Sequence, residues 1–421
     1  MISQNRRLTM KDNQAKYPQL RFKGFTDPWE KRRLGDMVLI SKDKNTDNQF
    51  GKNEVVSVSR EAGTVNQIEY QGRSFAANDV SNYKKIKLGD LVYTKSPLKG
   101  APYGIFQYAT IVGIVSPLYA VYHSTKKSFA PFVALQLRDD NIASHYLSRI
   151  VTKGAKNTIN VTDTDALDGY LNFPNRIEQQ KIFDFFQRLD NLITLNQRKL
   201  AKLKELKQGY LQKLFPQNGS KFPQLRFTGF ADAWEVRKLK DVLDISKTKN
   251  KAQQYGKVDV LSVSREVGTV NQIKYQGRSF AGSDLSNYKV VQGGELIYTK
   301  SPLKGAPYGI FQVATIKGIL SPLYAVYTST DKAYTPFVAM ALKNDNIATH
   351  YLTPLVTKGA KNTINVTDEG ALEGKIQFPS ILEQKQIFIF FKQLDDTIAL
   401  HQRKLEKLQE LKKGYLQKMF C

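Results

Sequence analysis

Cysteine is almost missing from this chain of 421 residues, since its one cysteine is Cys421. A single thiol excludes a disulfide framework and any zinc site built on cysteines, and four widely spaced histidines do not favour a histidine-built metal site. No apolar run approaches the roughly 18 residues that a membrane-spanning helix requires. Residues 1–16 are polar and basic and lack the apolar stretch of a secretory signal. We therefore expect a cytoplasmic protein that contacts no membrane.

The sequence also lacks the short motifs that mark common catalytic and nucleotide-binding sites. No strand is followed by G-x-G-x-x-G, and no P-loop, G-x-S-x-G or H-E-x-x-H motif occurs. The Asn/Asp-Pro-Pro-aromatic motif, with which amino-methyltransferases grip their target base, is absent as well. Asp163 and Asp165 lie close together, but paired aspartates of this kind usually belong to a turn. We expect no catalytic residue, metal or other cofactor in this chain, and interpret it as a binding protein.

Positive charge is what the chain has in excess. It carries 63 Lys and Arg against 38 Asp and Glu, a formal net charge of +25. With 41% hydrophobic residues the chain is not largely disordered. Such an excess favours a polyanionic partner, most often nucleic acid, over a basic protein that is merely kept soluble by its charge.

The chain is one unit written twice. The segment YPQLRFKGF at 17–25 returns as FPQLRFTGF at 222–230, and TKGAKNTINVTD at Thr152 returns unchanged at Thr357. Residues 17–215 align with residues 222–420 without a gap, at a constant offset of 205, and about two-thirds of the aligned positions are identical. This period is far too long for a solenoid repeat, so it is a duplicated module with a pseudo-twofold axis built into one chain.

Each module begins with a globular part that is rich in short strands. Turn residues separate the β-rich runs, and residues 141–151 are typical of a short helix. The pattern predicts a mixed α/β globule of about 155 residues, large enough for a core of its own. The runs predicted as strands are 55–59, 91–94, 109–115, 118–122 and 132–137.

Each module ends in a long helix. Apolar residues recur at alternating steps of four and three over about five heptads, which is typical of a coiled coil. A helix of about 38 residues is roughly 57 Å long, and each of the two helices is the obvious partner of the other. Asn196, His401, Lys207 and Lys412 occupy polar positions in the series, where such residues usually set the register. The apolar seam positions are Ile182, Phe186, Leu189, Ile193, Leu200, Leu203 and Tyr210, and in the second copy Ile387, Phe391, Leu394, Ile398, Leu405, Leu408 and Tyr415.

Three loop segments in each module combine basic residues with amides, hydroxyls and aromatic rings. Lysines and serines of this kind bind phosphates, whereas Arg can bridge guanine and Asn or Gln can bridge adenine. Basic loops are also commonly just solvated. The candidate DNA contacts are Arg60, Gln71, Arg73, Lys95, Ser96, Lys99, Tyr103, Lys153, Lys156 and Asn157, and in the second copy Arg265, Gln276, Arg278, Lys300, Ser301, Lys304, Tyr308, Lys358, Lys361 and Asn362.

All these candidates are the same in both copies. Residues 57–76 match their copies at 18 of 20 positions, whereas residues 37–56 match at 9 of 20, so the identity is unevenly spread. A recent duplication would also leave identities. Two DNA-binding surfaces that are nearly identical are expected to bind two nearly identical half-sites.

The chain closely resembles the specificity subunit of type I restriction–modification systems. Three patterns carry the resemblance, together with the doubled architecture. They are the module opening PQLRFKGFTDPWEKRRLGDM, the GDLVYTKS strand, and the helix entry FPNRIEQQKIFDFFQRLD with its Glu178-Gln179 pair, each echoed in the second copy. The resemblance covers almost the whole chain from Tyr17 to Phe420.

The resemblance implies a fold and a division of labour. Two α/β target recognition domains would be joined by two long helices, packed antiparallel as a coiled-coil spacer, and would read double-stranded DNA at a bipartite site. Two modification subunits would bring S-adenosylmethionine and methylate adenine, and two restriction subunits would bring ATP and Mg²⁺. The expected parts are a tail at 1–16, recognition domain 1 at 17–175, a helix at 176–215, a linker at 216–221, recognition domain 2 at 222–380 and a helix at 381–421.

In most members of that family the two recognition domains differ, but here they are about two-thirds identical. We therefore expect an interrupted palindrome or near-palindrome as the target. Three alternatives stay open at this point: the recognition subunit of a related system whose catalytic chain combines both activities, a stand-alone symmetric DNA-binding regulator, and a coiled-coil scaffold with basic lobes that reads no sequence.

Overall fold

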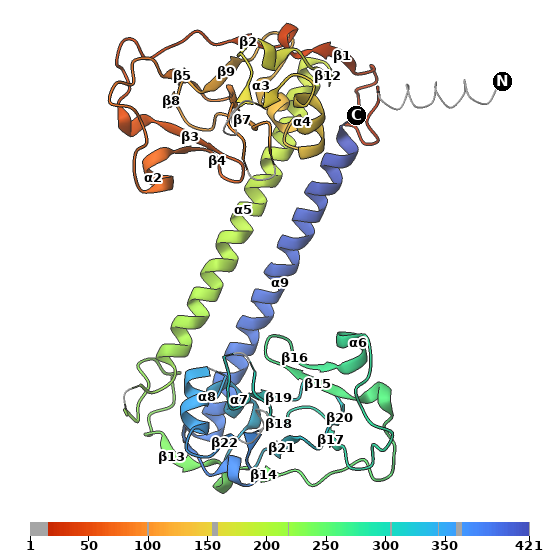
Figure 1. Ribbon diagram of the computed structural model, residues 1–421. Helices are drawn as coiled ribbons and strands as arrows, with labels where there is room; N and C mark the ends of the chain where they lie inside the picture. The colour runs from red at the N-terminus through yellow and green to blue at the C-terminus, as the bar shows by residue number, and fades with distance from the viewer. Residues whose placement is uncertain are drawn as a thin grey trace, which may run out of the picture. The chain divides into compact units, whose positions relative to one another are not determined.

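The computed structural model describes residues 16–98, 101–153, 159–217, 219–303, 305–343, 345–358 and 364–420. The chain divides into two compact units. Unit 1 comprises Met1–Gln197 and Arg403–Cys421, and unit 2 comprises Arg198–Gln402. Each unit therefore combines the globular part of one module with the start of its own long helix and the end of the other module's helix (Figure 1).

A four-stranded antiparallel sheet in the order β2-β9-β6-β7 forms the centre of unit 1. Four two-stranded ladders surround it, namely β1-β12, β3-β4, β5-β8 and β10-β11. The strands are β1 Glu30–Arg33, β2 Leu39–Ile40, β3 Val56–Ser59, β4 Gly63–Asn66, β5 Lys84–Ile86, β6 Leu91–Thr94, β7 Phe106–Tyr108, β8 Gly113–Val115, β9 Tyr119–His123, β10 Thr152–Lys153, β11 Ile159–Asn160 and β12 Tyr170–Phe173. The helical segments are η1 Leu34–Asp36, η2 Lys52–Glu54, α2 Gln67–Gln71, α3 Ala130–Gln136, α4 Asp140–Leu147 and η4 Asp165–Leu167.

The central strand β6 is buried on both faces, and its side chains alternate between two cores. Leu91 and Tyr93 pack with α3 and α4 in the larger core, whereas Val92 packs with Val58 and Val115 in the smaller one. The period of two along one strand thus separates two cores, with α3 and α4 on one side of the sheet and the β3-β4 and β5-β8 ladders on the other.

The predicted strand at 132–137 is wrong, because residues 132–136 belong to helix α3 and Leu137 caps it. Pro131 lies in the first turn, where its fixed φ favours a helix. Every residue of α3 is buried, so no apolar–polar periodicity was left to distinguish a short helix from a buried strand. Residues 109–112 of another predicted strand also lie outside the strands, since β8 begins at Gly113. The helix expected at 141–151 is α4.

Unit 2 repeats this topology with the sheet order β14-β21-β18-β19. Its strands are β13 Glu235–Lys238, β14 Asp244–Ile245, β15 Leu261–Ser264, β16 Gly268–Asn271, β17 Lys289–Val291, β18 Leu296–Thr299, β19 Phe311–Val313, β20 Gly318–Leu320, β21 Tyr324–Thr328, β22 Thr357–Lys358, β23 Ile364–Asn365 and β24 Lys375–Phe378. Its helical segments are η5 Leu239–Asp241, η6 Lys257–Asp259, α6 Gln272–Gln276, α7 Thr335–Ala341, α8 Asp345–Leu352 and η8 Gly370–Leu372.

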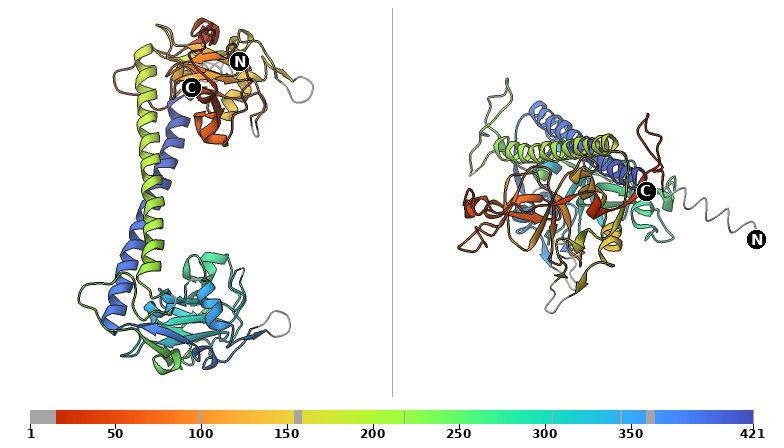
Figure 2. Two further views of the ribbon diagram at one scale, coloured as in Figure 1. Left: turned by 90° about the vertical axis from the view of Figure 1, so that its left-hand side faces the viewer. Right: turned by 90° about the horizontal axis from the view of Figure 1, so that it is seen from above.

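The two long helices are α5, Arg176–Lys213, and α9, Ile381–Met419. In unit 1 the start of α5 packs against the end of α9, with the rings of Phe185 and Tyr415 5.1 Å apart. In unit 2 the end of α5 packs against the start of α9, with Tyr210 and Phe390 at the same separation. The helices are therefore antiparallel, as their course in Figure 2 shows.

The seam of the helix pair is apolar with polar interruptions. All fourteen predicted apolar positions are buried or half-buried. Two of the polar positions form cross-helix ion pairs, Lys412 with Asp190 in unit 1 and Lys207 with Asp395 in unit 2. Asn196 instead donates to the carbonyl of Leu192, one turn back on its own helix, at 2.7 Å. Burial raises the cost of an unpaired charge, so the two ion pairs specify how the helices align.

The end of each helix completes the core of the other module's globule. Met419 is buried in the main core of unit 1, where Phe420 packs against Trp29 and Phe132. In unit 2 the corresponding residues are Leu214 and Phe215. Because a globule without this helix end would expose part of its core, the two modules depend on each other for stability.

Candidate nucleic-acid interface

A β-hairpin and a short helix hold the first group of candidate contacts. Arg60 lies in the turn between β3 and β4, and the buried side chain of Gln107 on β7 donates to the carbonyls of Ser59 and Arg60 at 3.3 and 3.2 Å. Gln312 holds the turn at Arg265 with the same two distances. The backbone of this turn is thus held by the edge strand β7 of the sheet in unit 1 and by β19 in unit 2.

Helix α2 follows the hairpin and is capped at both ends. The side chain of Asn66 accepts from the amides of Ile68 and Glu69, and Gly72 ends the helix with a φ of 74° that favours glycine. Gln67 then bonds to the amide of Phe75 at 2.7 Å and to Ser57 at 3.1 Å. The exposed segment after α2 is therefore held in one conformation.

This segment presents a cation stacked on an aromatic ring. The guanidinium of Arg73 lies 4.5 Å from the ring centre of Phe75, and that of Arg278 lies 4.6 Å from Phe280. The two phenylalanines are 56% and 58% exposed, although water contact with such rings is unfavourable. A planar donor group that is oriented in this way suits bidentate recognition of a base edge or phosphate. Gln71 and Gln276 are exposed and are the last residues of helices α2 and α6.

A cleft lies between the hairpin turn and the segment that joins α3 to α4. Arg60 and Arg138 line it above an apolar floor that includes Phe106 and Leu147. Arg265 and Lys343 line the corresponding cleft in unit 2. Two cations thus line each cleft, although Arg138 also pairs with Asp190 and Glu266 lines the second cleft as well.

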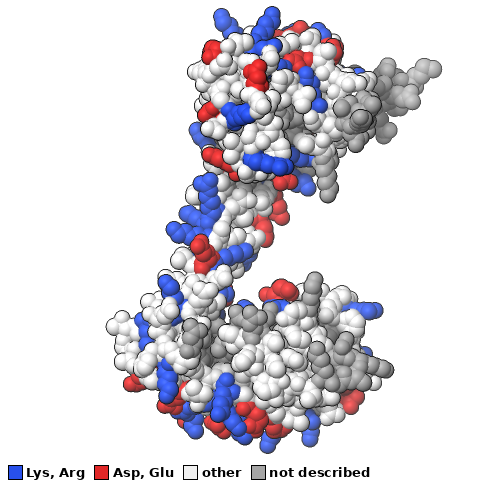
Figure 3. Space-filling model, turned by 60° about the vertical axis from the view of Figure 1, so that its left-hand side comes forward, with Lys and Arg blue, Asp and Glu red and all other residues white. Residues whose placement is uncertain are grey.

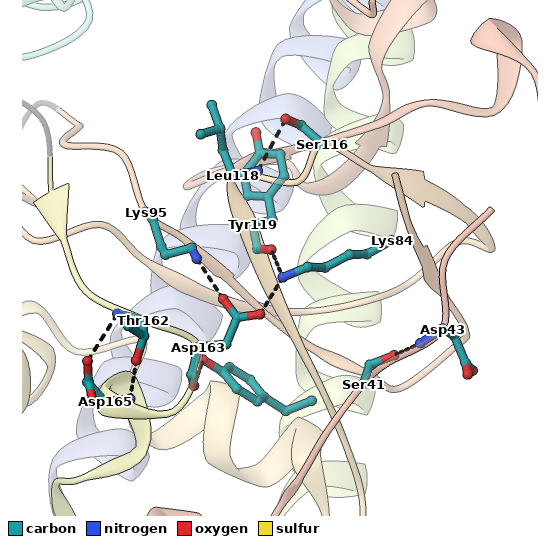
Figure 4. Close-up of polar contacts among 11 residues, drawn as sticks. Ser41, Asp43, Lys84, Lys95, Ser116, Leu118, Tyr119, Thr162, Asp163 and Asp165 are labelled. Carbon is teal, nitrogen blue, oxygen red and sulfur yellow. Dashed lines mark hydrogen bonds and ion pairs between the residues drawn. The ribbon is translucent and has the colours of Figure 1, made fainter. Parts of the chain in front are cut away.

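Lys95 is paired with a carboxylate of its own unit. Its ammonium group lies 2.6 Å from Oδ1 of Asp163, and Lys84 on β5 pairs with the other oxygen of the same carboxylate (Figure 4). Burial by itself raises the pKa of Asp163, but the hydrogen bonds from Lys84 and Lys95 outweigh it and hold that pKa below its ordinary value. In unit 2, Lys300 and Lys289 pair with Asp368 in the same way.

The remaining described candidates lie around this cluster. Ser96 is half-buried and its copy Ser301 is exposed. Tyr103 packs against the main core, and its carbonyl accepts a 2.6 Å hydrogen bond from Tyr93, whose pKa is raised by burial so that it stays a donor. Tyr308 is held likewise by Tyr298.

Six candidates lie outside the described residues, namely Lys99, Lys156, Asn157, Lys304, Lys361 and Asn362. The backbones of Lys153 and Lys358 belong to the strands β10 and β22, which pair with β11 and β23.

Sequence reasoning missed two groups that shape this region, one half-buried and one fully buried. We expected Asp163 to belong to a turn, but its carboxylate binds two lysines. Its recurrence as Asp368 in the second copy was the sequence signal that could have revealed this role. Glu178 is fully buried, and its carboxylate accepts hydrogen bonds from Nε and Nη2 of Arg21, both at 2.7 Å. The side chain of Gln179 accepts a hydrogen bond from the amide of Phe129 at 2.8 Å and donates one to the carbonyl of Lys127. The Glu-Gln pair and the PQLRF opening thus form a structural joint between globule and helix.

On the face shown in Figure 3, Lys and Arg are spread over the globular surface and along the helices, with Asp and Glu between them. Within the described ranges, no three His, Cys, Asp or Glu side chains come together in a way that could hold a metal ion. Among the helices that the structure describes, none has the length and apolar character needed to cross a membrane.

Comparison with known proteins agrees with the repeat. The sequence profile of the family described as "Type I restriction modification DNA specificity domain" matches residues 26–205 and again residues 231–410. The second match begins 205 residues after the first (231 − 26 = 205), the offset of the internal repeat.

Two curated relatives come from Methanocaldococcus jannaschii. The type I restriction enzyme MjaVIII specificity subunit is 25% identical over 252 residues, 56% of this chain and 57% of the relative. The putative type I restriction enzyme MjaX specificity subunit is 24% identical over 208 residues, 44% of this chain and 45% of the relative. The match to this chain spans about half the length of each of these relatives.

A solved structure shares the fold along the whole chain. The type I restriction–modification system S subunit from M. genitalium gives a TM-score of 0.55 at 12% identity, covering 96% of this chain and 99% of that one. At this identity the likeness shows the fold alone. The family profile, however, covers most of both repeats, and the chain therefore belongs to the family of type I restriction–modification DNA specificity domains.

Proposed function

We propose that this chain is the specificity subunit of a type I restriction–modification complex and that each unit reads one half of a bipartite DNA site. Its partners in this proposal are double-stranded DNA, two modification subunits that methylate adenine with S-adenosylmethionine, and two restriction subunits that use ATP and Mg²⁺. This chain selects the site, and the other chains carry out the chemistry.

The observation that carries the proposal is the duplication of the candidate contacts in geometry as well as in sequence. In both hairpin turns a glutamine donates to the carbonyls of the serine and the arginine at 3.3 and 3.2 Å, and both exposed arginines stack on a phenylalanine at about the same distance. A coiled-coil scaffold that reads no sequence needs no such matched detail. Two equal readers on antiparallel helices favour two equal half-sites in inverted orientation, that is, an interrupted palindrome or near-palindrome.

Methylation mapping tests this proposal directly. The chain is expressed with cognate modification subunits, and the methylated adenines in the host DNA are located by sequencing. We expect one motif with two related, inverted half-sequences around an unread gap. Two unrelated half-sequences would refute the palindrome but leave the bipartite site intact, whereas no motif would refute the specificity role.

A binding measurement distinguishes a specificity subunit from a stand-alone DNA-binding regulator. A specificity subunit is expected to need its modification subunits for full affinity, whereas a regulator binds its site tightly alone. For either reader, the ratio of specific to non-specific affinity stays well above one as salt is raised, while a scaffold loses affinity for all DNA equally.

A further inference from the structure

Asp163 joins the two segments that carry most of the basic candidate residues. Lys95 opens the segment that runs from the end of β6 to Tyr103, and Asp163 follows the β10–β11 hairpin by three residues. Its carboxylate holds Lys95 and Lys84, and its backbone carbonyl accepts a 2.9 Å hydrogen bond from the Tyr122 hydroxyl. One residue thus connects β5, β6 and β9 with the end of the hairpin (Figure 4).

The cluster is well suited to setting geometry and poorly suited to adding stability. Lys84 and Lys95 are 14% and 18% exposed, so their desolvation offsets much of the attraction to Asp163. Their hydrogen bonds have fixed directions, however, and Lys84 also donates to the carbonyl of Tyr119 at 2.8 Å. A carboxylate that accepts from two elements holds those elements at one separation.

The same cluster makes Lys95 an unsuitable direct contact for DNA. A phosphate would have to displace Asp163 from an ammonium group that is already hydrogen-bonded and largely buried. Unit 2 repeats the arrangement, with Lys300 at 2.5 Å from Asp368 and the Tyr327 hydroxyl at 2.9 Å from the Asp368 carbonyl. The charge of these lysines is therefore used inside each unit.

We propose that Asp163 and Asp368 are positioning residues for sequence readout. Asp163 holds the segment after β6 in register with the β10–β11 ladder, and Asp368 holds the segment after β18 in register with the β22–β23 ladder. Lys95 and Lys300 act through these carboxylates and do not bind phosphate themselves. This inference rests on the proposed function, since it assigns a role within the DNA-reading surface.

Asp163→Asn in the full chain, with its modification subunits, is the first test. The probes are a DNA duplex that carries the mapped motif and a shuffled duplex of the same composition. We expect the ratio of specific to non-specific affinity to fall by at least about tenfold, because misplaced side chains lose base contacts. Non-specific affinity stays equal or rises, because the variant is more positive by one charge.

Asp165→Asn is the matched control. Asp165 is exposed and lies two residues away, and its carboxylate accepts a 3.4 Å hydrogen bond from the Thr162 amide. The variant changes the net charge by the same amount, and we expect the affinity ratio to stay within about twofold of the parent. A fall in both variants would mean that charge, not position, controls the ratio, and the proposal would be wrong.

Lys95→Met is the second test and leaves Asp163 paired with Lys84. If Lys95 acts through Asp163, the affinity ratio falls while the slope of log affinity against log salt is unchanged. If Lys95 binds phosphate, affinity for both duplexes falls and the slope decreases by about one phosphate contact. The second result would overturn the proposal, even if Asp163→Asn fails to fold.

The parent protein separates this inference from the function on which it rests. If the parent does not discriminate between the two duplexes, the proposed function fails. If the parent discriminates and a folded Asp163→Asn variant discriminates equally well, only the positioning role fails.

Discussion

The two units agree where the candidate contacts are held and differ at contacts along and at the ends of the long helices. The Asp163 and Asp368 clusters and the two arginine–phenylalanine stacks are the same in both. At the helices, Asp190 in unit 1 binds both Lys412 and Arg138, whereas the position of Arg138 is taken by Lys343 in unit 2. The helix end that enters the main core carries Met419 in unit 1 and Leu214 at the equivalent position in unit 2.

This contrast indicates which positions packing constrains loosely. After the duplication, core and seam positions accepted other residues of similar volume, as protein cores generally do. The segment from Ser57 to Ala76 accepted only two changes, although much of it is exposed and makes few core contacts. Under the proposed function, the exposed part of this segment stays the same because both copies read the same ligand.

The largest expected effects come from the tryptophans that the helix ends cover. Trp29→Ala and Trp234→Ala should each lower the free energy of unfolding by about 3–5 kcal/mol, because both side chains are buried against Phe420 or Phe215. Calorimetry of both variants shows whether the loss stays within one unit. Trp29→Phe is the control and should cost less, since the Trp29 Nε1 has no hydrogen-bond partner in the described part of the chain.

The next largest effect is expected at the joint between globule and helix. Glu178→Gln leaves Arg21 facing a neutral amide, with the acid side chain fully buried, and should destabilise the protein by about 3 kcal/mol. Glu383→Gln should do the same through Arg226, which lies in the equivalent pair. Denaturant unfolding measures both, and a loss in only one unit would show that the joints are not equivalent.

A smaller and unequal effect is expected along the helix seam. Asp190→Asn leaves two cations, Lys412 and Arg138, without their shared carboxylate, whereas Asp395→Asn leaves only Lys207. We expect losses of about 2 and about 1 kcal/mol respectively, by thermal unfolding. Equal losses would mean that Arg138 contributes nothing and that the seam is as symmetric as the readers.

Acid should affect the two ion clusters alike, so the smallest difference between units is expected there. The pKa values of Asp163 and Asp368 lie below the ordinary value, which means that ionisation favours the folded state. Their contribution is complete above about pH 4 and is lost as pH falls through the folded-state pKa. The stability difference between parent and Asp163→Asn should therefore shrink in acid, and Asp368→Asn should follow the same curve in a pH series of unfolding measurements.

Several features of the fold were predictable because they are written in local patterns. Heptad spacing predicts both long helices, and the β6 run was expected at Leu91–Thr94, where the structure has it. Helix α3 was not predictable, since complete burial removes the periodicity that separates helix from strand. The pairing of Lys95 with Asp163, 68 residues away, was equally hidden, because a sequence does not show which carboxylate approaches which ammonium group.

The amino-acid sequence alone is enough to establish that this chain contains two copies of one module and is strongly basic. It also establishes that each copy has a strand-rich globule and a coiled-coil helix. These properties follow from composition, identity and period, which need no three-dimensional contact. Only the tertiary structure decided that the helix end of one module completes the core of the other, and that two of the most promising lysines are paired internally. Such contacts join residues far apart in the chain, and they depend on which surfaces remain buried once every element has packed.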